Sequence, residues 1–220
     1  MMVNTTVGSN TKKMHIRHFT LILFLILFVG STYGQKKFKV VVTETDTWKV
    51  MYSLVDEKGK LIRQLDTSKY LMCFNPDQYV YFGIFGLKGF KGWAAIDANE
   101  KILFDVYNTS LGEPSPDYLV EDKIRIVDSN NLIGFANTKG QVIINPQFEI
   151  ATSFQKGKAV IGQTCKKVPW GGHTKESDCN HFTIICQRHG YINETGMPLK
   201  IGEFSFEQII KEINWKAPDE

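Results

Sequence analysis

One short pattern occurs four times along this 220-residue chain, and it constrains the fold more than any other feature. Each copy reads apolar or aromatic, two residues, apolar, Asp or Asn, two polar residues, usually Gly, and then a short apolar run. The copies cover residues 52–62, 93–103, 133–148 and 190–199. Their Asp or Asn positions are 41, 40 and 56 residues apart, which indicates a regular array of repeats with one insertion.

The acidic or amide residue and the glycine of each copy predict a tight turn between two strands. An Asp or Asn side chain at the first turn position accepts hydrogen bonds from the backbone ahead of it, and Gly at the fourth position adopts a positive φ at little cost. The second copy has Glu100 in place of Gly, so there we expect Asn99 to take the left-handed conformation. The predicted turn residues are Asp56, Gly59, Asp97, Asn137, Gly140, Asn193 and Gly196.

The segments beside these turns are rich in β-branched and aromatic residues, as β-strands are. We therefore expect each repeat to form three short antiparallel strands, with successive repeats stacked edge to edge or face to face. The predicted fold class is all-β, an array of about four β-meander or hairpin repeats with a short C-terminal helix. The expected single domain covers 35–220, with repeats near 52–92, 93–132, 133–189 and 190–215 and an insertion at 164–186.

The copies resemble the bacterial WG repeat, whose consensus runs Trp-Gly-aromatic-Ile-Asp, two residues, Gly, an apolar run, Pro, one residue, aromatic, and then Phe and Gly before the next strand. The second copy keeps Trp93 but has Ala94 at the glycine position, the last copy keeps Gly190, and the first is degenerate. The resemblance covers roughly residues 50–215 and implies a β-rich array without a fixed activity. The third copy matches best, at Gly134, Phe135, Ala136, Asn137, Gly140, Pro146, Phe148, Phe154 and Gly157.

Residues 1–34 have the composition of a secretory signal peptide. Lys12, Lys13 and Arg17 precede an apolar run at 19–29, and small residues follow as far as Gly34. This run is shorter than the roughly 18 apolar residues that a membrane-spanning helix needs, although an uncleaved anchor is the alternative interpretation. We therefore expect cleavage after Gly34 and a secreted or periplasmic protein, which contacts a membrane only through the uncleaved signal.

The charge of the remaining chain argues against nucleic acid as a partner. The whole chain has 26 Lys and Arg and 23 Asp and Glu, and three of the basic residues but none of the acidic ones lie in residues 1–34. The chain after the predicted cleavage site is therefore formally neutral. Its basic residues cluster only at 36–39 and 166–167, whereas nucleic-acid binding requires a basic face.

The C-terminal segment is the exception to the β pattern. Ser205 is followed three residues later by Gln208, which is the signature of a helix capping box. Apolar residues then recur at helical spacing, and Pro218 follows. We expect a short helix here that covers the open end of the last repeat and stops before Pro218; its apolar residues are Phe206, Ile209, Ile210 and Ile213.

The insertion contains three of the four cysteines. Thirteen residues separate Cys165 from Cys179, six separate Cys179 from Cys186, and no Cys-x-x-Cys is present, so the spacing does not predict a metal site. In an exported protein such cysteines typically form a disulfide. Cys165–Cys179 is the candidate pair, which would clamp the loop, and Cys165–Cys186, which would bridge the strands at its base, is the alternative. Cys73 is expected to be a small buried apolar residue.

No catalytic or cofactor-binding residues are predicted. The histidines after residue 34, which are His173, His181 and His189, lie in or beside the insertion. No nucleophile-elbow motif accompanies them, and no phosphate-binding glycine-rich loop is present in the sequence. The adjacent carboxylates at 121–122 and 219–220 are typical of a solvated surface.

These observations favour an exported, non-enzymatic binding or scaffold module, because repeat arrays present extended surfaces without catalytic residues. Its expected partner is an unidentified protein or envelope component, and no cofactor is expected. Trp170 and His173 in the insertion form the candidate partner-contact loop, since loops on rigid scaffolds carry binding residues; alternatively, Trp170 folds back as a lid on the last repeat. Two other hypotheses remain: a redox- or metal-responsive envelope protein that uses the Cys/His insertion, and a hydrolase of unknown substrate.

Overall fold

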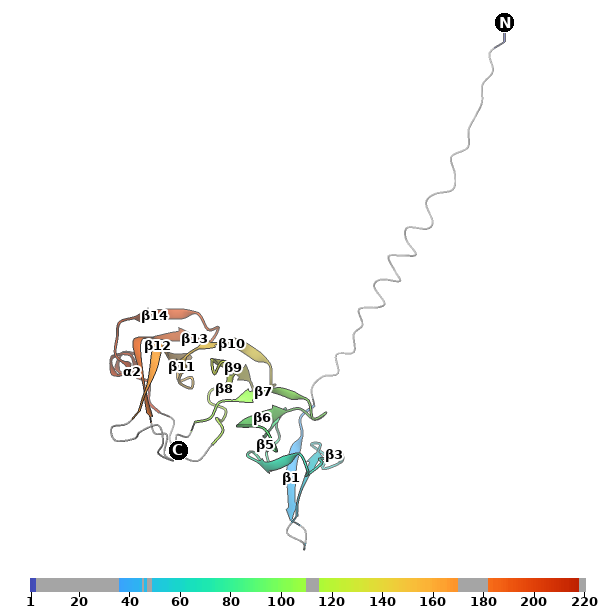
Figure 1. The fold of residues 1–220 in the computed structure, drawn as a ribbon. Helices are drawn as coiled ribbons and strands as arrows, with labels where there is room; N and C mark the ends of the chain where they lie inside the picture. The colour runs from blue at the N-terminus through green and yellow to red at the C-terminus, as the bar shows by residue number, and fades with distance from the viewer. Residues whose placement is uncertain (3–35, 45, 47–48, 110–114, 170–181, 218–220) are drawn as a thin grey trace. The chain divides into compact units, whose positions relative to one another are not determined.

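The computed structural model describes residues 1–2, 36–44, 46, 49–109, 115–169 and 182–217. The chain divides into two compact units, residues 1–34 and 35–220, and the account below concerns the second (Figure 1). Nearly all of the predicted signal peptide lies outside the described residues, as do Trp170, His173 and Cys179. None of the helices in the described part of the chain is long and apolar enough to cross a membrane.

The described part of residues 35–220 forms fourteen strands and one short C-terminal helix, which confirms the predicted all-β fold class. The elements are β1 (Lys39–Glu44), β2 (Val50–Val55), β3 (Leu61–Gln64), β4 (Tyr70–Cys73), β5 (Gly83–Leu87), β6 (Trp93–Ile96), β7 (Ile102–Val106), β8 (Lys123–Val127), β9 (Ile133–Asn137), β10 (Val142–Phe148), β11 (Ile150–Ala151), β12 (Lys158–Pro169), β13 (Phe182–Asn193), β14 (Pro198–Gly202) and α2 (Phe206–Ile213).

The strands pair as antiparallel meanders of three. These are β1-β2-β3, β5-β6-β7, β8-β9-β10 and β12-β13-β14. The two middle meanders join edge to edge, because β7 pairs with β8 through Asp105↔Val127 and Val106↔Ile126. With β4 added at its other end this becomes one seven-stranded sheet, while β11 joins the last meander to form a four-stranded sheet.

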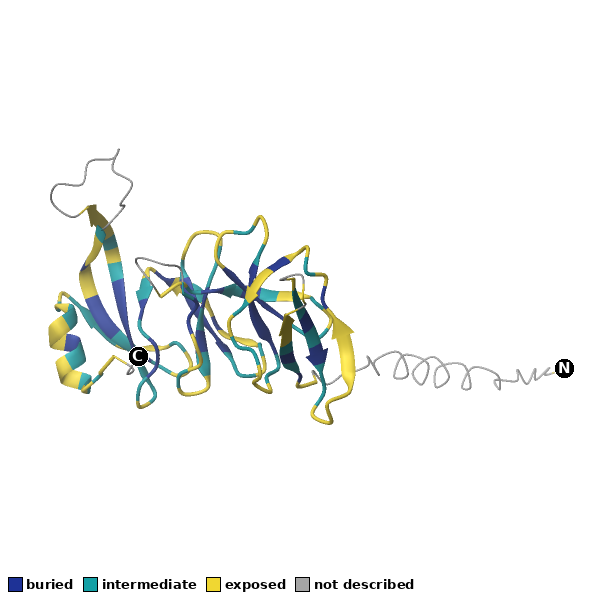
Figure 2. Ribbon diagram, turned by 90° about the horizontal axis from the view of Figure 1, so that it is seen from below, coloured by how far each residue is buried: buried dark blue, intermediate teal, exposed yellow. Residues whose placement is uncertain are grey.

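Buried side-chain clusters join the first and last meanders to the seven-stranded sheet, and the segment before β1 also pairs with the backbone before β5 through Phe38 and Val80. Figure 2 shows that the buried residues lie along the strands, while exposed residues lie at the turns, on α2 and on the outer strands. One cluster joins the first meander to β4, β5 and β6; it contains Phe38, Val40, Tyr52, Leu54, Leu65, Tyr70, Phe85 and Ile96. A second joins β9 and β10 to the last sheet; it contains Ile133, Phe135, Ile144, Phe148, Ala151, Phe154, Ala159, Ile161 and Ile192.

The predicted turns share one hydrogen-bonding pattern. In the third repeat, Oδ1 of Asn137 accepts hydrogen bonds from the backbone N–H groups of Lys139 and Gln141, both at 3.0 Å, and Gly140 has a φ of +72°. The same pattern of bonds to the second and fourth residues ahead occurs at Asp56, Asp97 and Asn193.

The second copy shows that the expectation for Asn99 was wrong. Glu100, at the position of the usual glycine, adopts the left-handed conformation, with a φ of +65°. Its carboxylate accepts hydrogen bonds from the hydroxyl of Tyr70 at 2.9 Å and from the guanidinium of Arg63 at 3.3 Å. These two contacts offset the strain of a side chain at positive φ. They come from residues 30 and 37 positions away, so the local sequence does not reveal them.

A close approach of two strands explains the glycine that opens the third repeat. A Cβ atom added to Gly134 would lie 2.5 Å from the backbone oxygen of Ile144 and 2.5 Å from the backbone nitrogen of Pro146. Here β10 shifts its register against β9, so its backbone crosses over the glycine. No side chain fits at that point without moving the strand.

The C-terminal helix forms where it was predicted. The hydroxyl of Ser205 accepts a hydrogen bond from the backbone N–H of Gln208, and the side chain of Gln208 accepts one from the backbone N–H of Ser205. The helix ends at Asn214, in the left-handed conformation. It contacts β12 and β13, and Ile209 is its buried residue.

Candidate functional site

A hollow of about 540 Å³ lies where the segment between β7 and β8 faces the segment between β11 and β12. Its size is typical of small-molecule sites. Three aromatic side chains line it, together with four hydroxyl-bearing residues and one Asp–Arg pair. They are Phe74, Tyr118 and Trp215; Thr109, Ser115, Thr152 and Ser153; and Asp117 and Arg125.

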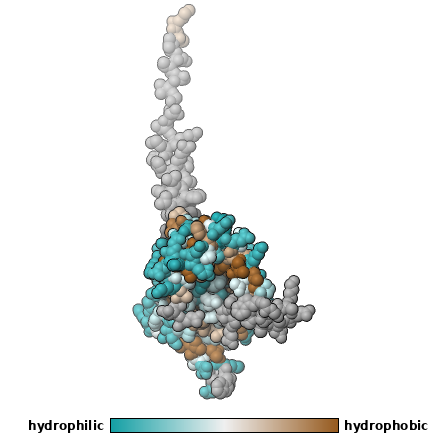
Figure 3. Space-filling model, turned by 90° about the vertical axis from the view of Figure 1, so that its left-hand side faces the viewer, coloured by the Kyte–Doolittle hydropathy of each residue, from teal (hydrophilic) through white to brown (hydrophobic). Residues whose placement is uncertain are grey.

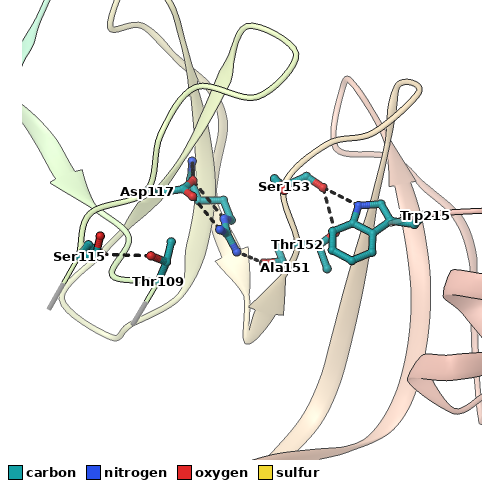
Figure 4. A network of polar contacts seen from close by, with 8 residues as sticks. Thr109, Ser115, Asp117, Ala151, Thr152, Ser153 and Trp215 are labelled. Carbon is teal, nitrogen blue, oxygen red and sulfur yellow. Dashed lines mark hydrogen bonds and ion pairs between the residues drawn. The ribbon is translucent and has the colours of Figure 1, made fainter. Parts of the chain in front are cut away.

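The Asp117–Arg125 pair lines this hollow, and Figure 4 shows the contacts of Asp117. The carboxylate of Asp117 is 1% exposed and accepts hydrogen bonds from Nε of Arg125 at 3.1 Å and from Nη2 at 2.7 Å. It also accepts one from the backbone N–H of Arg125 at 2.8 Å. Nη1 of Arg125 donates to the backbone oxygen of Ala151 at 3.2 Å, and the guanidinium lies 4.5 Å from the ring centre of Tyr107.

This geometry fixes the position of both charged groups. Removing one partner of such a buried pair leaves an uncompensated charge and costs several kcal/mol, roughly 3–5. Because Arg125 also contacts Ala151, the pair ties β8 to β11 and so links the seven-stranded sheet to the last sheet.

The opposite wall is held by Trp215, which follows α2. Its indole Nε1 donates a hydrogen bond to the backbone oxygen of Ser153 at 3.0 Å, and the hydroxyl of Thr152 donates to the same oxygen at 3.0 Å (Figure 4). The Thr152 hydroxyl accepts from the backbone N–H of Val160 at 2.9 Å. Trp215 is therefore oriented by a specific bond 62 residues away in the sequence.

The other two aromatic residues of the hollow are exposed. Tyr118 is 42% and Phe74 is 39% exposed, although both are large apolar rings. On the face seen in Figure 3, by contrast, apolar side chains form small patches among polar ones. Exposed aromatic rings that gather around one polar pair are typical of a binding site rather than of a random surface.

The residues predicted from the sequence lie elsewhere. The turn residues occupy the ends of hairpins, where they satisfy backbone groups and do not meet in one place. Trp170 and His173, the candidate partner-contact loop, are outside the described residues. His189, the histidine that the structure does describe, is 8% exposed and its Nδ1 lies 2.9 Å from the backbone oxygen of Phe204.

The first prediction of the disulfide pairing was wrong. Cys165 is bonded to Cys186, the alternative pairing, and not to Cys179. The reason is that β12 continues to Pro169, into the predicted insertion, and pairs there with the start of β13, which places Cys165 opposite Cys186 in register. Cys73 is a free thiol and is partly buried; burial raises its pKa to about 12.

The sequence did not lead us to predict the hollow, although it contains one indication of a polar pair at this place. Arg125 interrupts the aliphatic strand β8, and a charged residue on a strand that packs against another sheet requires a partner. Asp117 lies eight residues earlier, directly after Pro116. The role of Trp215 depends on the position of α2, which no local pattern gives.

Residues 133–163 match the family model described as WG containing repeat. The chain therefore contains a WG repeat at these residues. The matched WG repeat contains β9, β10, β11 and the first part of β12, and it includes Thr152 and Ser153 of the hollow. A comparison with curated proteins finds no match. Within the described ranges, no three His, Cys, Asp or Glu side chains are grouped to hold a metal ion.

Proposed function

We propose that this WG-repeat protein is an exported, non-enzymatic binding module and that the hollow beside Arg125 and Trp215 is its recognition site. The observation that carries the proposal is the combination, in one hollow, of two exposed aromatic rings with a polar pair held in a fixed orientation by its own hydrogen bonds. Such a site offers contact area and oriented donors, which is what recognition of a ligand requires.

The chemistry of the described groups supports binding rather than catalysis. Asp117 accepts three hydrogen bonds from Arg125, so it is poorly placed to take a proton from a substrate. The thiol of Cys73, with its raised pKa, stays protonated at neutral pH and is a weak nucleophile. His189 is buried against Phe204 and Phe206 and is not one of the residues that line the hollow.

The test is a comparison of partner capture by two variants with equal exposure of the altered ring. Tyr118→Ala removes an aromatic ring from the hollow, and Tyr79→Ala removes one that is 43% exposed outside it. The purified chain and both variants are used to capture components of the native cell envelope. We expect Tyr118→Ala alone to lose the captured partner, with melting temperatures that stay close together. Equal capture by both variants would mean that the hollow is not the recognition site.

A redox-responsive role is the second candidate, and the Cys165–Cys186 disulfide favours it. This bridge joins opposite residues of β12 and β13 at the base of the insertion, so its reduction would remove the covalent link between two strands that stay paired through their backbones. The measurement is the fraction of free thiol in the chain isolated from cells, with and without oxidative stress. A disulfide that stays fully oxidised in both conditions would leave it a purely structural role.

A further inference from the structure

The charge balance of the hollow restricts the class of ligand. Its acidic and basic side chains, Asp117 and Arg125, are paired with each other, so together they present no net charge to a ligand. Phosphate and carboxylate groups are recognised by arginine forks or lysines that are free to pair with them. The hollow is therefore built for an uncharged molecule.

The hydrogen-bonding groups of the hollow indicate hydroxyl groups on that molecule. A guanidinium has five N–H donors, and three of those in Arg125 are bonded to Asp117 and Ala151. Two N–H donors are left to point at a ligand oxygen. The hydroxyls of Ser115, Ser153 and Tyr118 make no side-chain hydrogen bond to other described residues, and a hydroxyl both donates and accepts.

The aromatic residues supply the apolar part of the recognition. Phe74, Tyr118 and Trp215 come from three segments that are far apart in the sequence and present rings around one hollow. Figure 4 shows Asp117 and Trp215 on different segments, with Ala151, Thr152 and Ser153 between them. A ligand that suits this site has flat faces of C–H groups for the rings and hydroxyls at its rim for the polar groups.

We infer that the hollow binds a neutral saccharide. A pyranose ring has the required chemistry, because its C–H groups form apolar faces and its hydroxyls lie at the rim. The rings of Tyr118 and Trp215 would pack against such faces, and the free N–H groups of Arg125 would donate to hydroxyl oxygens. This inference rests on the proposed function, for which it names the class of ligand.

The experiment is isothermal titration calorimetry of the purified full chain with defined probes. The neutral probes are cellobiose, maltotriose and N,N′-diacetylchitobiose, and the charged probes are glucuronic acid and inorganic phosphate. We expect at least one neutral probe to bind. We expect Tyr118→Ala to weaken that binding by about tenfold, the change that loss of one aromatic contact produces, and Tyr79→Ala to leave it unchanged. Melting temperatures of both variants report whether the fold is intact.

Three results would overturn the inference: no neutral probe binds, a charged probe binds more tightly, or Tyr118→Ala binds as well as the unaltered chain. Failure of the ligand class is separable from failure of the proposed function. If no sugar binds but envelope capture is still lost in Tyr118→Ala and kept in Tyr79→Ala, the hollow is a recognition site for another kind of ligand. If neither sugar binding nor capture depends on Tyr118, both the saccharide inference and the proposed recognition site are wrong.

Discussion

At the scale of single residues, the repeated turn is a backbone geometry that several side chains can support. The left-handed position is Gly59, Gly140 and Gly196 in the first, third and last copies and Glu100 in the second. A fifth turn, between β8 and β9, has the same pattern, because the carboxylate of Asp128 accepts hydrogen bonds from the backbone ahead of it. Asn131 occupies the left-handed position in this turn, with a φ of +61°. The Asp or Asn at the first position is the shared feature, and glycine is the least costly way to complete the turn.

Gly140→Val tests this geometry. Gly140 has a φ of +72°, and a β-branched residue is strained there, so we expect the free energy of unfolding to fall by more than about 1 kcal/mol. The matched control is Gly140→Asn, which should cost less because Asn tolerates the left-handed region. Chemical denaturation of both variants makes the measurement. Equal stability of the valine and asparagine variants would mean that the turn is set by something other than φ.

Gly134→Ala tests the close approach of β10 to β9. The added Cβ would meet backbone atoms of Ile144 and Pro146, which cannot rotate away, so we expect a loss of about 1–3 kcal/mol. Gly86→Ala is the control, because its added Cβ would have its nearest neighbour at 3.5 Å, in the side chain of Trp93. That control should be neutral or slightly stabilising, since alanine restricts the unfolded chain. A tolerated Gly134→Ala would contradict the register of β9 and β10.

Asp105 is the residue for which the structure predicts a pH effect. Burial raises the pKa of its carboxyl above the usual value of about 3.9. A carboxyl whose folded pKa is raised stabilises the fold below the unfolded pKa, and this contribution is lost as the pH rises through the folded pKa. Asp105→Asn should therefore raise the melting temperature at pH 7, and the gain should shrink below about pH 4. A gain in melting temperature that is equally large at pH 3 would mean that Asp105→Asn acts through packing and not through the loss of a charge.

At the scale of elements, local patterns account for the hairpins and for α2. Asp56, Asn137 and Asn193 mark turns, and Ser205 with Gln208 marks the helix start, because each acts on residues within one turn of itself. The hollow could not be predicted in this way. Its pair Asp117–Arg125 and the bond from Trp215 to Ser153 form only after separate elements have packed together. The Cys165–Cys186 pairing likewise depends on how far β12 and β13 extend.

The disulfide gives the prediction for the β12–β13 element. Cys165 and Cys186 are 21 residues apart, and closing a loop of this length restricts the unfolded chain by about 3 kcal/mol in the entropic model. We expect Cys165→Ser with Cys186→Ser to lower the free energy of unfolding by roughly that amount, and the reduced unaltered chain to match it. Cys179→Ser is the control and should leave stability unchanged. A loss of the same size in Cys179→Ser would instead indicate that Cys165 pairs with Cys179.

At the scale of the whole unit, residues 35–220 combine two ways of joining repeats. The middle meanders share a backbone ladder between β7 and β8, whereas the outer ones join mainly through buried side-chain clusters. Sheets that meet by side chains leave hollows at the margins of the contact, and the proposed site lies at such a margin, between the seven-stranded and the four-stranded sheet. The repeats thus supply a rigid frame, and residues from the connections supply the specific groups.

Export is the prediction that concerns the complete chain. The apolar run at 19–29, preceded by Lys12, Lys13 and Arg17, should direct the protein across the membrane, with cleavage after Gly34. Intact mass and N-terminal sequencing of the protein from extracytoplasmic fractions should show a chain that begins near Gln35. Leu25→Arg interrupts the apolar run and should retain the uncleaved chain in the cytoplasm, because a charged residue opposes insertion of the run. An uncleaved chain in the membrane fraction of the unaltered protein would instead identify residues 19–29 as part of an anchor, and the proposed site would then work at a membrane surface.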